Sequence, residues 1–154
     1  MKTTIKTIQF MLCLAIAITT MSCKKDKNGK DGDIGKTGKF TIDGVNYTGN
    51  TEVQTFVNDN YSIVCQQDDP FKLIQVTFHN QAEAEAGGTF DVENNALNVP
   101  SSGVNVGIDG LTFNPHGSNT ISVSGKKITI SNLKLDQTGG GSKHPLINSA
   151  SINF

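Results

Sequence analysis

Hydrophobic and polar residues alternate in short runs from Phe40 to Phe154, and Gly, Asn, Asp and Ser separate the runs. The clearest run is KLIQVTFHN, in which Ile74, Val76 and Phe78 share one face while the other face is polar. Side chains alternate across a strand, so this pattern predicts β-strands. The segment NQAEAEAGG is the one window with helical character, and it predicts one or two turns of helix.

Two-residue turns are predicted where turn chemistry and the apolar pattern agree: at Asp43-Gly44, Asp109-Gly110 and Gly125-Lys126. The turns should place these apolar residues opposite one another: Ile42 and Val45, Phe40 and Tyr47, Ile108 and Leu111, Val106 and Phe113, Val123 and Ile128, Ile121 and Ile130. Asp-Gly suits a type I′ turn and Gly-X a type II′ turn, the two types whose twist matches paired strands. A slip of one residue would put the apolar sets on opposite faces, so the register is predicted as well.

The phase of the apolar positions changes at Ser131-Asn132, between the segments ITI and LKL. Such a change predicts a bulge or bend, as occurs where a strand crosses between sheets. The pattern gives about nine or ten strands in the 115 residues of a single domain, 40–154. The expected fold is all-β, an antiparallel β-sandwich, with a small β-barrel as the alternative.

The N-terminus has a different pattern: Lys2 and Lys6 precede the apolar run FMLCLAIAI, and TTMSC follows. This predicts a signal peptide over residues 1–22, because the run of nine is far shorter than the roughly 20 residues of a membrane span. TTMSC resembles the lipobox of bacterial lipoproteins, in the looser form found in Bacteroidota lipoproteins. The resemblance implies that Cys23 becomes the first residue of the mature chain and carries lipid. It also implies a cell-envelope location, at the outer membrane, facing the periplasm or the surface. The alternative is an ordinary secretory cut that leaves Cys23 as a free thiol.

Residues 23–39 carry glycine at every third position from Gly29 to Gly38. Three G-X-Y triplets without proline do not make a stable collagen helix. A calcium loop is disfavoured because Lys30 stands where an EF-hand loop needs a ligand oxygen. From residue 24 to 39 there are six lysines, three aspartates and hardly any apolar residue, so the segment predicts a flexible tether. Its lysines are attracted to anionic lipid headgroups.

The predicted domain has the opposite charge: five lysines, no arginine and eleven acidic residues give a net charge of −6. This balance excludes a nucleic-acid-binding function, which needs cations for the phosphates. Cys13 leaves with the signal peptide and Cys23 is the expected lipid site, so Cys65 has no disulfide partner. Cys65 is in phase with its apolar neighbours and is expected to be a small buried hydrophobe rather than a catalytic thiol.

No catalytic residue, metal ligand or cofactor is predicted, because His79, His116 and His144 lack a zinc spacing and no G-x-S-x-G occurs. The acidic candidates are Asp68, Asp69, Glu83, Glu85, Asp91 and Glu93. They would supply oxygen ligands for calcium or the acid pair of a glycosidase; the simpler interpretation is solvated loops. The loops NALNVPSSG and TGGGSKHP are long enough to be binding loops, and they are equally typical of flexible surface loops without a binding function.

The edges of the domain, FTIDGVNYTG and SASINF, are similar to small uncharacterised lipid-anchored β-sandwich domains of Bacteroidota. This resemblance implies architecture and location, and it assigns no functional residue. The sequence therefore predicts a lipid-anchored, non-catalytic binding or adhesion module. It contacts the membrane through Cys23, and a glycan or an envelope protein is its candidate partner. The alternatives are a structural or accessory subunit of an envelope assembly and a glycan-active hydrolase.

Overall fold

The computed structural model describes residues 36–154, and this part contains ten β-strands and one short helix. They are β1 (Thr37–Ile42), β2 (Val45–Thr55), β3 (Tyr61–Gln67), β4 (Lys72–Phe78), α1 (Gln81–Ala86), β5 (Gly88–Val92), β6 (Gly103–Ile108), β7 (Leu111–Pro115), β8 (Thr120–Ser124), β9 (Lys127–Gln137) and β10 (Leu146–Asn153). The predicted signal peptide, Cys23 and the tether up to residue 35 lie outside the described residues. β1 begins at Thr37, three residues before the predicted start of the domain.

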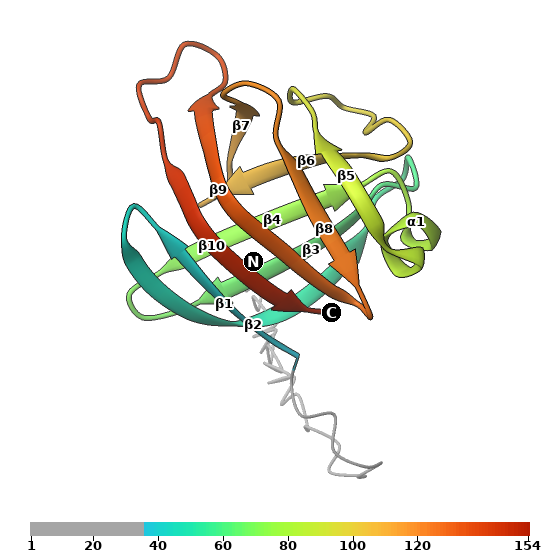
Figure 1. Cartoon of the computed structure of the whole chain (residues 1–154), viewed down its shortest axis with the longest axis horizontal. Coiled ribbons are helices and arrows are strands. Elements are labelled where there is room, and N and C mark those ends of the chain that lie inside the picture. The colour runs from blue at the N-terminus through green and yellow to red at the C-terminus, as the bar shows by residue number, and fades with distance from the viewer. Residues whose placement is uncertain (1–35) are drawn as a thin grey trace, which may run out of the picture. The chain divides into compact units, whose positions relative to one another are not determined.

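Nine strands form a closed barrel in the order β1-β2-β3-β4-β6-β5-β8-β9-β10, because β10 pairs with both β9 and β1 (Figure 1). β7 is the additional strand. It pairs with the ends of β6 and β9, while β5 and β8 pair with the starts of these two strands. The predicted all-β fold and the number of strands are confirmed, and of the two architectures the structure supports the barrel. Barrel closure joins positions as distant as Lys39 and Ser151.

The expectation of an entirely antiparallel sheet is wrong for one pair of strands. β5 and β6 are parallel, with Asp91 opposite Gly103 and Val92 opposite Val104. The chain returns between them through residues 93–102, which contain no strand or helix. We call this segment the roof loop, because it lies against the outer surface of the barrel: the Asn105 side chain of β6 donates to the Ala96 carbonyl at 2.8 Å.

The inner pair of each predicted hairpin is confirmed: Ile42 with Val45, Ile108 with Leu111, and Val123 with Ile128. The next pair is confirmed only in the first hairpin, where Phe40 lies opposite Tyr47. The β6–β7 ladder ends at Thr112 because β7 continues against β9, and the β8–β9 ladder ends at Ser122. The Gly125-Lys126 turn is also different, since φ is positive at both residues (56° and 58°), as in type I′ and not type II′.

The two Asp-Gly turns join the neighbouring strand in the same way. The Asp43 N–H donates to the Leu146 carbonyl at 2.9 Å, and its Oδ1 accepts from the Leu146 N–H at 2.8 Å. Asp109 makes the same two bonds with Leu73, both at 3.0 Å, and its other carboxylate oxygen accepts from Lys72 Nζ at 2.7 Å. Each turn residue therefore extends a ladder at the end of the barrel, in addition to reversing the chain.

Two long strands bend so that each can pair with different neighbours along its length. β9 bends at Asn132, where φ is +49°, between the segments that pair with β8 and with β7. The bend predicted at Ser131-Asn132 is therefore confirmed. β2 pairs with β1 through residues 45–50 and with β3 through residues 50–55, and Gly49 stands at the changeover. Glycine is common at such barrel corners because no side chain obstructs the neighbouring backbone.

The inward side chains fill the barrel, and Phe78, Cys65 and Ile63 have no exposed surface. Cys65 is therefore the buried hydrophobe that the sequence predicts, and burial raises the pKa of its thiol. The short helix is confirmed as α1, which begins where the Asn80 side chain accepts from the Glu83 N–H at 2.8 Å. No helix in residues 36–154 is long and apolar enough to cross a membrane.

Candidate ligand-binding groove

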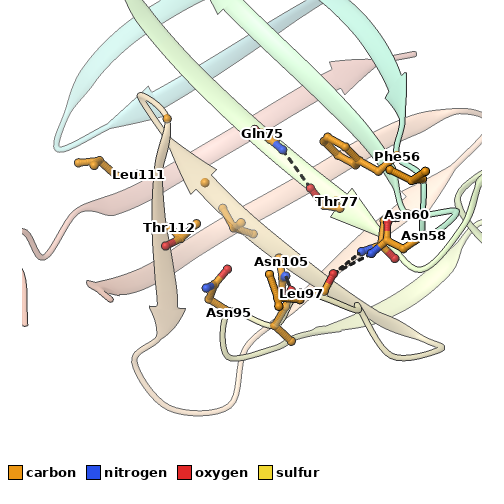
Figure 2. Close-up of a pocket in the computed structure, with 15 residues that line it drawn as sticks. Phe56, Asn58, Asn60, Gln75, Thr77, Asn95, Leu97, Asn105, Leu111 and Thr112 are labelled. Carbon is orange, nitrogen blue, oxygen red and sulfur yellow. Dashed lines mark hydrogen bonds between the residues drawn. The ribbon is translucent and has the colours of Figure 1, made fainter. Parts of the chain in front are cut away.

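The outer surface of the barrel carries a groove with a volume of about 540 Å³. Its floor is made by the outward residues of β4 and β6, and β7 borders it through Leu111 and Thr112. Its walls are the roof loop and residues 56–60, which we call the side loop and which connect β2 to β3. Figure 2 shows Thr112, Asn95 and Asn105 between Leu111 on one side and Phe56 on the other.

The floor follows from the alternation that the sequence shows in β4. Because Ile74, Val76 and Phe78 point into the barrel, Gln75 and Thr77 point outward. The Gln75 side-chain amide donates to the Ser62 hydroxyl at 2.9 Å. It also donates to the Thr77 hydroxyl at 3.2 Å (Figure 2). These two bonds fix the Gln75 side chain. Its carbonyl oxygen accepts no hydrogen bond from the described residues.

Carboxamide side chains join the two walls. Asn58 Nδ2 donates to the Leu97 carbonyl at 2.8 Å, and Asn60 Nδ2 donates to the same oxygen at 3.1 Å (Figure 2). The ring of His79, half-buried at the end of β4, bonds the Val99 carbonyl at 2.7 Å through Nδ1. These bonds hold the roof loop against the side loop and the barrel, so the groove exists before any ligand arrives.

Two polar groups of the groove have no partner within the described part of the chain. Asn105 donates to the roof loop through Nδ2, but its Oδ1 is buried and accepts no hydrogen bond. Asn95 is held through its backbone, whose N–H donates to Asn114 at 2.9 Å, and its carboxamide makes no bond. The Asn105 oxygen is enclosed, whereas the Asn95 carboxamide is exposed to the groove.

The rim of the groove is apolar. Leu97 of the roof loop is 93% exposed, and Phe56 of the side loop is 43% exposed. Val57 lies beside Phe56 and is also exposed. Exposed apolar side chains that gather around a concavity mark a binding surface more often than scattered ones do.

The groove is electrically neutral. None of the fifteen described residues that line it carries a titratable side chain, although eleven acidic residues and five lysines occur from Phe40 onward. The lining therefore offers neither a counter-charge for an ionic ligand nor an acid–base pair, and it offers hydrogen bonds and apolar contact.

The sequence candidates lie elsewhere. His116 and His144 are distant in the sequence, but both donate from Nδ1 to the Asp136 carboxylate, at 2.9 and 2.7 Å. The bond from His144, followed by that from His116, lowers the pKa of Asp136. All three side chains are well exposed. In residues 36–154 no group of three or more His, Cys, Asp or Glu side chains is arranged to hold a metal ion.

The acidic residues of α1 have structural partners. Glu83 accepts from the Ser101 hydroxyl at 2.6 Å and from the Ser102 N–H at 3.0 Å, and these bonds lower its pKa. Glu85 accepts from Lys126 at 3.0 Å. The Glu83 bonds hold the last residues of the roof loop, so this carboxylate positions the groove without lining it.

The remaining acidic candidates are at the surface. Asp91 and Glu93 border a separate open hollow of about 440 Å³ beside residues 115–119. Asp68 accepts from the Gln66 side chain at 2.7 Å, and Asp69 precedes Pro70 in the β3–β4 turn.

The sequence partly identifies the groove. The loop NALNVPSSG was a candidate binding loop, and residues 95–97 of it line the groove. The side loop and the outward residues of β4 and β6 were missed. The only sequence signal for the side loop is the density of asparagine in FVNDN, and the outward residues of β4 and β6 have none.

Comparison with known proteins adds no relative: no family model, curated protein or solved structure matches this chain.

Proposed function

We propose that this protein is a lipid-anchored cell-envelope lipoprotein whose barrel is a non-catalytic binding module, with the groove as its ligand site. One observation carries the proposal: a preformed groove of about 540 Å³ combines unsatisfied carboxamides, an apolar rim and a lining without titratable side chains. Small-molecule sites have volumes of roughly 300–1,000 Å³ and the same combination of apolar walls with a few polar groups. A groove without acid, base or metal ligand supports recognition rather than turnover.

The fixed loops support the same proposal. The roof loop is held at its centre by Asn58 and Asn60, and at its end by Glu83. A binding site whose walls are already ordered loses less conformational entropy when the ligand binds. The ligand is expected to be uncharged, because an ion would lose its hydration without gaining a counter-charge.

A screen of small neutral fragments by amide chemical shifts tests the groove. Benzyl alcohol, cyclohexanol and acetanilide are the neutral probes, and benzoate and benzylamine are the charged ones. We expect the neutral probes to shift the side-chain amides of Asn95, Asn105 and Gln75, and the charged probes to shift them less. Thr112→Trp should remove the response because an indole would occupy the groove, which Thr112 borders.

The matched control is Thr48→Trp, since Thr48 is also an exposed strand threonine and does not line the groove. Shifts that are spread over the surface, or that persist in Thr112→Trp, would count against the groove and favour a structural or accessory role.

The lipid anchor has a separate test. In cells, Cys23→Ala should move the protein from the membrane fraction to the soluble fraction, because the lipid would have no attachment point. Immunoblots of fractions, with biotin labelling of intact cells, measure this redistribution. The control is Cys65→Ala, since Cys65 is fully buried and should not affect fractionation. Membrane retention of the Cys23→Ala variant would refute the anchor.

A further inference from the structure

We infer that the ligand of the groove is a neutral carbohydrate, bound with one face of a sugar ring on Phe56 and with its hydroxyls on Gln75 and Asn95. This inference rests on the proposed function, because it names the ligand of the same groove. It is carried by the hydrogen-bonding capacity of the lining, the position of the exposed aromatic ring and the absence of charge from the lining.

The polar side chains match hydroxyl groups. A sugar hydroxyl both donates and accepts, and a carboxamide offers a donor and an acceptor in one plane. In this groove the Gln75 carbonyl oxygen and the Asn95 carboxamide make no bond within the described residues, whereas the Gln75 amide is held by Ser62 and Thr77. The fixed Gln75 side chain offers a free acceptor, and the Asn95 carboxamide offers both a donor and an acceptor to adjacent hydroxyls.

The Asn95 carboxamide separates a carbohydrate from an apolar ligand. Asn95 lines the groove and is exposed, and its side chain makes no hydrogen bond within the described residues. A hydrocarbon that covered it would remove its oxygen and its amide from water without a partner, at a cost of about 1–3 kcal/mol for each group. A hydroxyl supplies both a donor and an acceptor.

The aromatic residue is placed for stacking. Phe56 lines the groove and is 43% exposed, so part of its ring is open to a ligand. Its backbone is fixed in the side loop: the Phe56 N–H donates to the Asn60 carbonyl at 2.9 Å, and its carbonyl accepts from the Asp59 N–H at 3.0 Å. The C–H groups on one face of a pyranose ring are weakly positive and apolar, which suits the negative face of an aromatic ring.

Charge selects among carbohydrates. The groove has no cation for a carboxylate or a sulfate, and the sequence from Phe40 onward has a net charge of −6. Acidic glycans would therefore be repelled by the domain and find no counter-ion in the groove. Neutral oligosaccharides are not repelled by the acidic domain and need no counter-ion in the groove.

The experiment is a titration of the full chain with neutral oligosaccharides, namely maltohexaose, cellohexaose and mannohexaose, up to about 10 mM, since weak complexes have Kd values near 1 mM. Hexagalacturonate is the acidic probe and N-phenyl-1-naphthylamine is the apolar probe. Calorimetry and amide shifts are the readouts. We expect at least one neutral oligosaccharide to shift the side-chain amides of Gln75, Asn95 and Asn105, and hexagalacturonate to give no such shift.

Two variants assign the contacts. Phe56→Ala should weaken binding about tenfold, the loss expected for one aromatic contact. Asn95→Leu should weaken it by a similar factor, because it replaces a carboxamide with a side chain of similar size that cannot bond. The matched control is Phe71→Ala, since Phe71 is an exposed phenylalanine outside the groove. Equal affinities of Phe56→Ala and Phe71→Ala would overturn the assignment.

The other outcomes separate this inference from the proposed function. If the neutral fragments or N-phenyl-1-naphthylamine enter the groove and no oligosaccharide does, the carbohydrate inference is overturned while the binding function stands. If no probe enters the groove, both are overturned.

Discussion

We expect Phe78→Ala to lower the free energy of unfolding by about 4 kcal/mol, because a truncated core phenylalanine leaves a cavity in addition to the lost burial. Phe78 has no exposed surface, and its ring meets that of Phe90 edge to face, with 5.0 Å between the centroids. Phe90 lies in β5, the strand that precedes the roof loop. Urea unfolding followed by circular dichroism measures the loss.

The control for this prediction is Phe71→Ala, which removes an exposed ring and should change the stability by less than about 0.5 kcal/mol. Phe78→Leu keeps most of the volume and should lie between the two. A Phe78→Ala variant that is as stable as Phe71→Ala would show that the barrel interior is not packed around this ring.

We expect Gly49→Ala to cost about 3 kcal/mol, at the upper end of the range for overpacked cores. A Cβ atom at Gly49 would lie 2.5 Å from both the carbonyl carbon and the oxygen of Gln66, which belong to the backbone of β3. Neither atom can move without disturbing the ladder at the point where β2 changes partners. The loss of stability is measured by urea unfolding, with the m-value as a check that the variant still unfolds in one step.

Gly38→Ala provides the comparison, because its added Cβ would lie 2.6 Å from the Cys65 sulfur, a side-chain atom. Cys65→Ala should therefore recover part of the stability lost in Gly38→Ala and none of that lost in Gly49→Ala. Equal recovery in both backgrounds would mean that the Gly49 contact is with a side chain as well.

The sequence predicts the local part of the fold well. Strands, the three turns and the bend at Asn132 depend on neighbours along the chain, and all of them are found. The outer hairpin pairs were predicted wrongly at Phe113 and Ile121, because the two hairpin ladders end at Thr112 and Ser122. Beyond these points Phe113 pairs with Gln137 and Ile121 with Phe90. The length of each ladder depends on how distant strands close the barrel, and local alternation carries no information about it.

The same limit explains why the barrel was predicted only as the alternative to a sandwich and why the groove was not predicted. Closure depends on β10 meeting β1, and the parallel β5–β6 pair depends on the path of the roof loop. The groove combines the side loop, β4, the roof loop, β6 and β7, five segments spread over residues 56–112. Its floor residues, such as Gln75 and Asn105, look in the sequence like ordinary outward positions of strands. Only their meeting in space makes them a candidate site.

Closure of the barrel also limits how this protein can associate with others. Each of the ten described strands pairs with at least two other strands. An exposed strand edge is where a foreign strand can add to a sheet, whether in a specific complex or in an amyloid-like aggregate. Within residues 36–154 the ring has no terminal strand, and the unpaired stretches that remain are short, such as residues 52–55 of β2, which pair with β3 alone. A partner therefore has to recognise mainly side chains and loops. We therefore expect the protein to stay monodisperse at high concentration and to take part in assemblies without exchanging strands.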